Sequence, residues 1–355
     1  MRNIAAILCL CSLMACQSTV ADTQPNPNLA ESVGFSSERL DRIAPVMQSY
    51  IDQGKLAGTL TLVARNGKIA YLNAQGMQDK EAGKPMTEDT IFRIYSMSKP
   101  VTAVAAMTLW EQGKFHMFDP IGKYLPELAN MKVYVSGSGD SMVVEDAKSP
   151  IRIIDLFMHT SGFSYGFTAS EVDKLYQKML SKPDELNRGN ILAKFAEIPL
   201  THQPGTAWNY GVSTDIIGFL VEKLSGKKLG EYMQETIFSP LGMKDTGFHV
   251  PSNKLDRLTQ IYTADRKTGQ TIVMENEPLG DYMSDPDIHN AGGGLVSTMQ
   301  DYFTFAQMML NGGEINGVRI LGRKTVEYMS TNHLPKNLVP FANDAQGEGY
   351  GLAMS

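Results

Sequence analysis

A serine and a lysine in the run Ser96-Met97-Ser98-Lys99 have the types and spacing of a catalytic pair. Residues i and i+3 lie on one face of a helix, so on a first helical turn the Ser96 hydroxyl and the Lys99 amine can meet. A lysine held among apolar residues loses its proton more readily and can serve as the base for the serine. The positive potential of a helix N-terminus also favours the negative charge that develops in acyl transfer. The run is therefore compatible with a serine nucleophile, but it often occurs by chance, and a helix start with a surface lysine has the same pattern.

Motifs on both sides of Ser96 favour the catalytic interpretation. The stretch 92–103 resembles the nucleophile region of class C β-lactamases and their relatives, which include the family VIII carboxylesterases and the D-stereospecific peptidases. Further runs are similar to this family and follow its order: Phe118-Asp119-Pro120, Tyr124-Leu125-Pro126-Glu127-Leu128, Leu156-Phe157-Met158-His159-Thr160-Ser161-Gly162, Pro204-Gly205, Trp208-Asn209-Tyr210, Pro240-Leu241-Gly242-Met243 with Thr246, and Gly292-Gly293-Gly294-Leu295 with Ser297, Thr298 and Asp301. The resemblance covers roughly residues 35–355.

The resemblance implies that Tyr210 is the second catalytic residue. A phenol beside an ammonium can share the proton taken from Ser96 and deliver it to the leaving group. The alternative is a tyrosine that packs beside Trp208 on a loop. One departure from the family bears on the substrate, because the β-lactamases have Tyr-x-Asn where this chain has Tyr210-Gly211-Val212. Val212 has no amide to bind a β-lactam side chain or to orient Lys99, so we expect a carboxylic ester as substrate.

Other patterns in the chain suggest chemistry but are better explained as structure. Gly162-Phe163-Ser164-Tyr165-Gly166 matches the nucleophile elbow, which needs a strand before the serine and a helix directly after it, whereas here the preceding segment has helical spacing. Lys267-Thr268-Gly269 lies in a polar stretch and is interpreted as a turn. The glycine run at 292–294 lacks the Lys-Ser/Thr ending of a phosphate loop and is expected to let backbone approach the cleft closely. The six histidines are scattered without paired-ligand spacing, so we expect neither a metal site nor a cofactor.

Apolar spacing and turn residues predict the elements that must position these groups. Asn66-Gly67 between two β-prone runs predicts a hairpin over 59–72. Ser149-Pro150 suggests an N-cap followed by proline at the first helical position. A first helix is expected to begin at Ser36-Ser37-Glu38 and to end at Gly54. Further helices are expected over 97–112, from 150 to 158, 172–180, 216–224 and 298–310, and a loop-rich stretch with a hairpin over 246–274.

The family resemblance implies an α/β (α+β) fold of the β-lactamase/transpeptidase-like type, with an antiparallel sheet flanked by helices and an all-helical insertion. We expect residues 35–128 to form the N-terminal part of the α/β domain with the nucleophile. Residues 129–290 are expected to form the mainly helical domain with Tyr210, and residues 291–355 to begin the return to the α/β domain.

The N-terminus carries the pattern of an export signal. Arg2 precedes an apolar run over 4–15 that is too short for a permanent membrane anchor. Leu13-Met14-Ala15-Cys16 resembles a bacterial lipobox, which predicts a signal peptide over 1–15, lipidation of Cys16 and a tether over 16–34. The alternative is cleavage after Ala21 and release of a soluble protein. Gln17 favours the outer membrane, so we expect a periplasmic lipoprotein.

Composition excludes several other classes. The chain has 355 residues, 43% of them hydrophobic, and a net charge of −6 without a basic patch, so nucleic acid is not an expected partner. All three cysteines lie at or before Cys16, which excludes disulfides and cysteine nucleophiles from the rest of the chain. The expected partner is a small ester or amide, with membrane contact only through the lipid anchor.

The run Tyr350-Gly351-Leu352 near the end of the sequence corresponds to the start of a strand in the family. The resemblance implies further strands, a third active-site motif and a final helix beyond Ser355. We therefore expect the chain to be a C-terminally truncated form whose oxyanion hole has the Ser96 N–H but not a second N–H, a loss of about 10²–10³ in rate. The rival functions are a β-lactamase or D-amino-acid peptidase, and a non-catalytic protein that binds peptidoglycan fragments.

Overall fold

The computed structural model describes residues 29–275, 277, 280, 282–339 and 349–354. The predicted signal peptide, Cys16 and the tether up to residue 28 lie outside the described residues. Within the described part of the chain, no helix combines the length and apolar character needed to cross a membrane.

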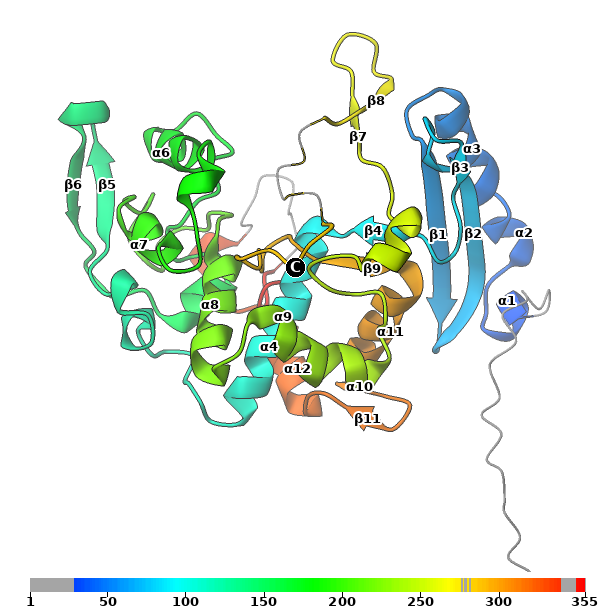
Figure 1. Cartoon of the computed structure of the whole chain (residues 1–355). Coiled ribbons are helices and arrows are strands. Elements are labelled where there is room, and N and C mark those ends of the chain that lie inside the picture. Colours follow the sequence, from blue (N-terminus) through cyan, green and yellow to red (C-terminus); the bar gives the residue numbers. More distant parts are fainter. Residues whose placement is uncertain (1–28, 276, 278–279, 281, 340–348, 355) are drawn as a thin grey trace, which may run out of the picture.

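Three short helices and a long hairpin form the N-terminal part of the fold (Figure 1). Asn66 and Gly67 both have positive φ, 53° and 73°, as the predicted two-residue hairpin turn requires. The single helix predicted from Ser36 to Gly54 is instead two helices, because residues 41–42 form a turn between them. The elements are α1 (Leu29–Ser32), α2 (Ser37–Leu40), α3 (Ile43–Asp52), β1 (Gly58–Arg65), β2 (Lys68–Asp79) and β3 (Lys84–Pro85).

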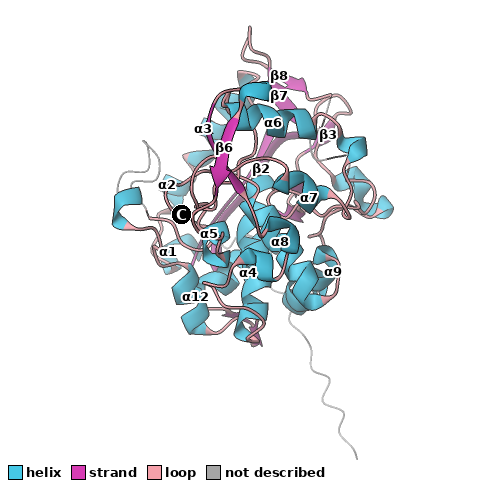
Figure 2. Cartoon of the chain, turned by 90° about the vertical axis from the view of Figure 1, so that its left-hand side faces the viewer, coloured by secondary structure: helices cyan, strands magenta, loops and turns pink. Residues whose placement is uncertain are grey.

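Helix α4 (Ser98–Glu111) runs through the centre of the molecule (Figure 1). It follows β4 (Ile91–Arg93) and the 3₁₀ turn η1 (Tyr95–Met97). Its residues are buried on nearly every side, as expected for a helix that is apolar all round. Helix α8 (Ser213–Ser225) packs along it, and Figure 2 shows α4, α5 and α8 side by side.

The middle of the chain is mainly helical and contains two hairpins: β7–β8, which lies in the stretch 246–274 where a hairpin was predicted, and β5–β6, which was not predicted. The helix predicted to start at Pro150 is α5, which starts at Ile153. Arg152 has extended backbone, with ψ 155°, and exchanges hydrogen bonds with Asp155 in a capping arrangement. The backbone before it pairs with Pro120 and Ile121, so these residues are held out of the helix. The elements are η2 (Ile121–Lys123), η3 (Pro126–Leu128), β5 (Lys132–Ser136), η4 (Gly139–Ser141), β6 (Val143–Asp146), α5 (Ile153–Phe157), α6 (Glu171–Leu180), η5 (Pro183–Glu185), α7 (Ile191–Ala196), α8, α9 (Leu229–Met233), the π-helical turn η6 (Gln234–Phe238), α10 (Ser239–Leu241), η7 (Ser252–Arg257), β7 (Tyr262–Ala264) and β8 (Thr271–Val273).

The last part of the chain returns to the nucleophile region. Strand β9 (Val296–Thr298) pairs antiparallel with β4, so the glycine run before it lies beside the start of α4. The helix predicted over 298–310 is α11 (Met299–Leu310), and Thr298 is its N-cap, with a side chain that accepts the Asp301 N–H. The remaining elements are β10 (Glu314–Ile315), β11 (Val318–Arg319), α12 (Arg323–Met329) and η8 (Lys336–Leu338).

The strands pair antiparallel, but in the described residues they form five separate sheets, the largest being β1-β2-β3. One hydrophobic core extends along the chain from Ile94 to Ala353 and includes side chains of α4, α8 and α11. This core crosses the domain boundaries predicted at 128/129 and 290/291, which remain predictions. The site therefore belongs to a scaffold of helices packed around α4.

Candidate active site

Ser96 lies in the 3₁₀ turn between β4 and α4, where its side chain is exposed. Tyr95, directly before it, has φ 43° in the left-handed region, which is unusual for a bulky residue and stores strain of about 1–3 kcal/mol. The turn is held by the Met97 N–H, which donates to the Ile94 carbonyl at 3.0 Å. The fold thus presents the serine hydroxyl at a strained corner at the surface of the core.

Lys99 is almost completely buried, with 4% of its surface exposed, and its ammonium lies beside the serine. The Lys99 Nζ donates to the Ser96 Oγ at 3.2 Å and to the Gly292 carbonyl at 2.7 Å. It also lies over the rings of Tyr210 and Tyr165, 4.6 Å and 5.2 Å from their centroids. The spacing predicted from the sequence therefore places the two groups in hydrogen-bond contact.

Tyr210 completes the cluster from a segment far away in the sequence. Its hydroxyl lies 2.6 Å from the Ser96 Oγ. The loop before α8 holds it there, because the Asn209 N–H donates to the His159 carbonyl and the Asn209 amide donates to the Phe163 carbonyl, both at 2.8 Å. The next residue must be a glycine, since a Cβ on Gly211 would lie 2.3 Å from the Phe163 carbonyl oxygen. The structure thus brings together all three residues predicted to be catalytic.

Two residues near Lys99 were not predicted to belong to the site. Tyr165 donates its hydroxyl to Asp215 at 3.0 Å, and Asp215 also accepts the Gly292 N–H at 3.0 Å. Burial raises the pKa of the Asp215 carboxyl, and burial, followed by the charge of Asp215, raises that of the Tyr165 phenol well above 10. A signal for Asp215 was present in the sequence, because it is an acidic residue at the start of a helix that continues with apolar residues.

His159 lies behind Tyr210 and is completely buried. The ring centroids of the two side chains are 4.9 Å apart, and the His159 Nδ1 accepts the Gly211 N–H at 3.3 Å. Burial, together with the positive charge of Lys99, lowers the pKa of His159 to about 3. The imidazole is therefore neutral at ordinary pH.

The alternative motifs lie in ordinary structural positions. The Ser164 hydroxyl is buried and donates to Asp173. The residues directly before this serine form helix α5 and a loop, and not the strand that a nucleophile elbow needs. Lys267-Thr268-Gly269 forms the turn of the β7–β8 hairpin, where the Asp265 carboxylate accepts the backbone N–H groups of Lys267 and Thr268. This hairpin projects from the body of the molecule (Figure 1). Both motifs are therefore structural, as expected from the sequence.

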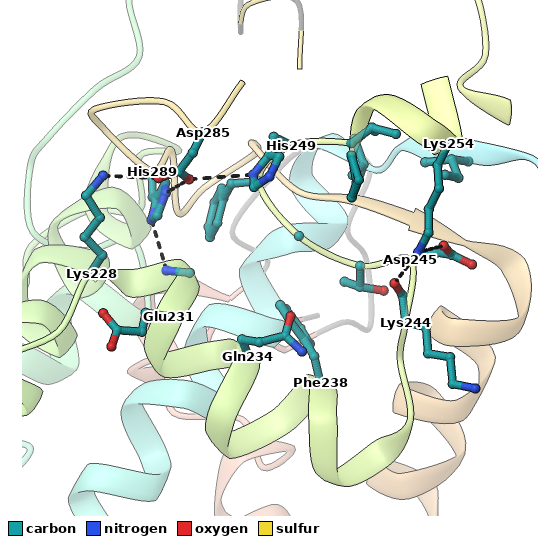
Figure 3. A pocket seen from close by; sticks show the side chains of 18 residues that line it. Lys228, Glu231, Gln234, Phe238, Lys244, Asp245, His249, Lys254, Asp285 and His289 are labelled. Carbon is teal, nitrogen blue, oxygen red and sulfur yellow. Dashed lines mark hydrogen bonds and ion pairs between the residues drawn. The ribbon is translucent and has the colours of Figure 1, made fainter. Parts of the chain in front are cut away.

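A cavity of about 460 Å³ lies between α9, η6 and the loop that carries Asp245 and His249 (Figure 3). Ser96, Lys99 and Tyr210 are not among the residues that line it. Three lysines line this cavity, and two of them are in ion pairs, Lys228 with Asp285 at 3.2 Å and Lys254 with Asp245 at 2.7 Å. Among the described residues, no group of three or more histidine, cysteine and acidic side chains could hold a metal ion.

The chain is similar in sequence and in structure to several known proteins. A family model described as Beta-lactamase matches residues 43–355. Protein Rv1367c of Mycobacterium tuberculosis is 35% identical over 324 residues, which cover 89% of this chain and 79% of the relative. Esterase EstB of Burkholderia gladioli is 31% identical over 211 residues, 58% of this chain and 51% of the esterase. The structure of EstCE1, a hydrolase with promiscuous acyltransferase activity, superposes with a TM-score of 0.73 at 25% identity, covering 89% of this chain and 82% of EstCE1.

Proposed function

Because the chain belongs to the β-lactamase family, we propose that it is a serine hydrolase that cleaves carboxylic esters through an acyl-enzyme on Ser96. One observation carries the proposal: the Ser96 Oγ lies within hydrogen-bond distance of both the Lys99 Nζ and the Tyr210 hydroxyl. A nucleophile, a group that removes its proton and a group that can return it are thus in mutual contact. The fold is that of the β-lactamases and transpeptidases.

The geometry supports a two-step reaction. The Ser96 oxygen bonds to the ester carbonyl carbon while its proton passes to the Lys99–Tyr210 pair, which reacts in the form that holds one proton fewer than an ammonium and a phenol together. The tetrahedral intermediate expels the alcohol, which leaves with that proton, and acyl-Ser96 remains. Water then adds to the acyl carbon and gives a proton to the same pair. When the bond to the Ser96 oxygen breaks, this proton returns to the serine and the carboxylic acid is released.

Two features favour an ester over a β-lactam. Val212 stands where the β-lactamases of the resemblance have an asparagine, and it is a buried residue at the start of α8. It offers no hydrogen bond to the amide side chain of an antibiotic. EstB and EstCE1, to which the chain is similar, are named as an esterase and a hydrolase.

An aromatic surface next to the nucleophile suggests what the ester carries. The Tyr165 ring lies 5.3 Å from the Tyr210 ring, and Phe167 stacks on Tyr165 at 5.2 Å while 76% of its own surface is exposed. An exposed aromatic ring stacked on the edge of a site is a favourable contact for an apolar group. We therefore propose esters with an apolar acyl or alcohol group, which pack against Phe167.

Covalent labelling tests nucleophile and reaction class together. Intact mass spectrometry after treatment with a fluorophosphonate is expected to show one adduct, which S96A abolishes. S164A is the matched control, because Ser164 is the serine of the competing motif, and it should label like the unchanged protein. Absence of an adduct on the unchanged protein would favour the non-catalytic binding alternative.

Substrate preference is tested separately. We expect the protein to hydrolyse p-nitrophenyl butyrate at a higher kcat/KM than nitrocefin or a D-alanyl-D-alanine peptide. Faster hydrolysis of the cephalosporin or the peptide would contradict the ester proposal and support the rival β-lactamase or peptidase.

We propose that the protein is exported to the periplasm and anchored to the outer membrane by lipid on Cys16. The proposal rests on the lipobox-like run that ends at Cys16 and on Gln17 after it. Metabolic labelling with an alkyne fatty acid should mark the unchanged protein and C11S but not C16S. An unlabelled protein whose N-terminus follows Ala21 would contradict the anchor.

A further inference from the structure

Val212 has no amide that could orient the Lys99 ammonium, so other groups must orient it. An ammonium has three donor hydrogens, and in the described structure its hydrogen bonds go to the Ser96 Oγ and the Gly292 carbonyl. The Gly292 carbonyl is the shorter contact, at 2.7 Å. The direction in which the Lys99 ammonium points therefore depends on how the backbone at Gly292 is held.

Asp215 holds that backbone through the Gly292 N–H. It is 92% buried on the first turn of α8, five residues after Tyr210. One carboxylate oxygen accepts the Gly292 N–H at 3.0 Å, and the other accepts the Tyr165 hydroxyl at 3.0 Å. The same glycine thus donates to Asp215 with its N–H and accepts from Lys99 with its carbonyl.

The space around Gly292 is closed. A Cβ at this position would lie 2.3 Å from the Tyr165 hydroxyl and 2.8 Å from an Asp215 carboxylate oxygen. On the preceding residue, the Ala291 carbonyl accepts the Thr102 hydroxyl of α4 at 2.8 Å. The segment is therefore clamped between α4 and α8, and Asp215 is the α8 side of this clamp.

We infer that Asp215 is a positioning residue for acylation, which acts through Gly292 and Tyr165 to hold Lys99 beside Ser96. This inference rests on the proposed function, because it concerns the same nucleophile. The carboxylate takes over the orienting contact that Val212 cannot make. Its loss lets the Gly292 carbonyl and the Tyr165 ring shift relative to Lys99, and misplacement of a reacting group by about 1 Å can cost about 10²-fold in rate.

A purely structural carboxylate makes a different prediction. A buried acid that only supports the fold affects stability when it is changed, without changing the rate of the folded protein. Asp301 is a suitable example, since it is also buried and accepts the Asp245 N–H at 2.7 Å and the Thr246 hydroxyl at 2.9 Å. Burial raises the pKa of its carboxyl, as it does for Asp215. D301N is therefore a matched control for D215N.

The test separates binding from chemistry in D215N, Y165F and D301N. Pre-steady-state release of p-nitrophenol from p-nitrophenyl butyrate gives the acylation rate constant and the substrate dissociation constant, and thermal unfolding gives Tm. For D215N we expect acylation to slow about 10²-fold with the dissociation constant little changed. Y165F, which loses one hydroxyl, should slow acylation in the same direction by a smaller factor, and D301N should lower Tm with acylation unchanged.

Two outcomes overturn the inference and differ from failure of the proposed function. If D215N acylates as fast as D301N while both lose stability, Asp215 is only structural. If D215N does not fold, Y165F provides the test. An unchanged acylation rate in Y165F would show that the contacts of Asp215 with Tyr165 and Gly292 do not contribute to acylation. If the fluorophosphonate does not label Ser96 in the unchanged protein, the proposed function itself is wrong. If it labels the unchanged protein and D215N equally fast, only the role of Asp215 is rejected.

Discussion

Helix α4 and the β1–β2 hairpin both contain many apolar residues, but they are buried to different extents. Val101, Val104 and Met107 of α4 have no exposed surface. In β1, by contrast, every residue is half-buried or exposed. Burial of apolar surface is the dominant stabilising contribution, so the two regions depend on the rest of the chain to different degrees.

The contacts of the two regions differ in kind as well. Gln78 at the end of β2 accepts the Thr90 hydroxyl at 2.8 Å and donates to the Asp256 carbonyl at 2.9 Å. α4 is instead packed against α8 and tied to the segment that precedes β9. The hairpin packs mainly on α1 and α3, which are near it in the sequence, whereas the site lies in a core made of distant segments. Changes near the site should therefore have larger effects than changes in the hairpin.

The largest expected effect is the loss of the proton-transfer group in the core. Y210F removes the hydroxyl that contacts Ser96, and general acid–base groups contribute about 10²–10⁴ in rate. We expect kcat/KM for p-nitrophenyl butyrate to fall by a factor in this range, measured by initial rates. Y50F, on the exposed part of α3, should leave kcat/KM unchanged, and equal losses in both variants would contradict the contrast between the regions.

A cavity in the helical core should destabilise the protein strongly. Leu220 on α8 has no exposed surface, and Leu→Ala at such positions costs about 2–5 kcal/mol. Urea unfolding of L220A should show a loss of this size. A loss below about 1 kcal/mol would mean that the core around α8 closes over the cavity, and the contrast with the hairpin would fail.

Acid should weaken the core through His159, whereas residues 58–79 of the hairpin contain no histidine. Burial lowers the pKa of His159 from about 6.5 to about 3. Below pH 6.5 the unfolded chain therefore binds a proton that the folded chain does not. The stability from neutral His159 is complete above pH 6.5 and is lost as pH falls toward 3.

H159N removes this titration while offering an amide oxygen to the Gly211 N–H. The difference in free energy of unfolding between the unchanged protein and H159N should be smaller at pH 4.5 than at pH 7, measured by urea denaturation at each pH. A difference that stays constant between the two pH values would show that His159 is not the acid-sensitive group.

The smallest effect is expected in the hairpin. Leu62 on β1 is half-buried, so L62A should lower the free energy of unfolding by about 1 kcal/mol and leave esterase activity unchanged. Urea unfolding and initial rates test both parts. A loss as large as that of L220A would show that the hairpin and the helical core form one equally packed unit.

Prediction from sequence succeeded where local pattern decides the structure. The Asn66-Gly67 turn and the helix predicted over 298–310 are formed as expected. It was wrong at Pro150, because pairing of residues 151–152 with the segment at 120–121 outweighs the local N-cap pattern and delays the helix to Ile153. That pairing joins segments about thirty residues apart, and local spacing does not register such contacts.

The same division applies to the site. The Ser96–Lys99 contact follows from a separation of three residues on a helical turn, so the sequence alone determined it. Family motifs pointed to Tyr210, but its contact with Ser96 joins residues 114 positions apart. The bond between Asp215 and Gly292 spans 77 positions and was not foreseen. Only the packing of α8 along α4 brings these groups together, because contacts between distant segments depend on how whole elements pack and not on the spacing within any one of them.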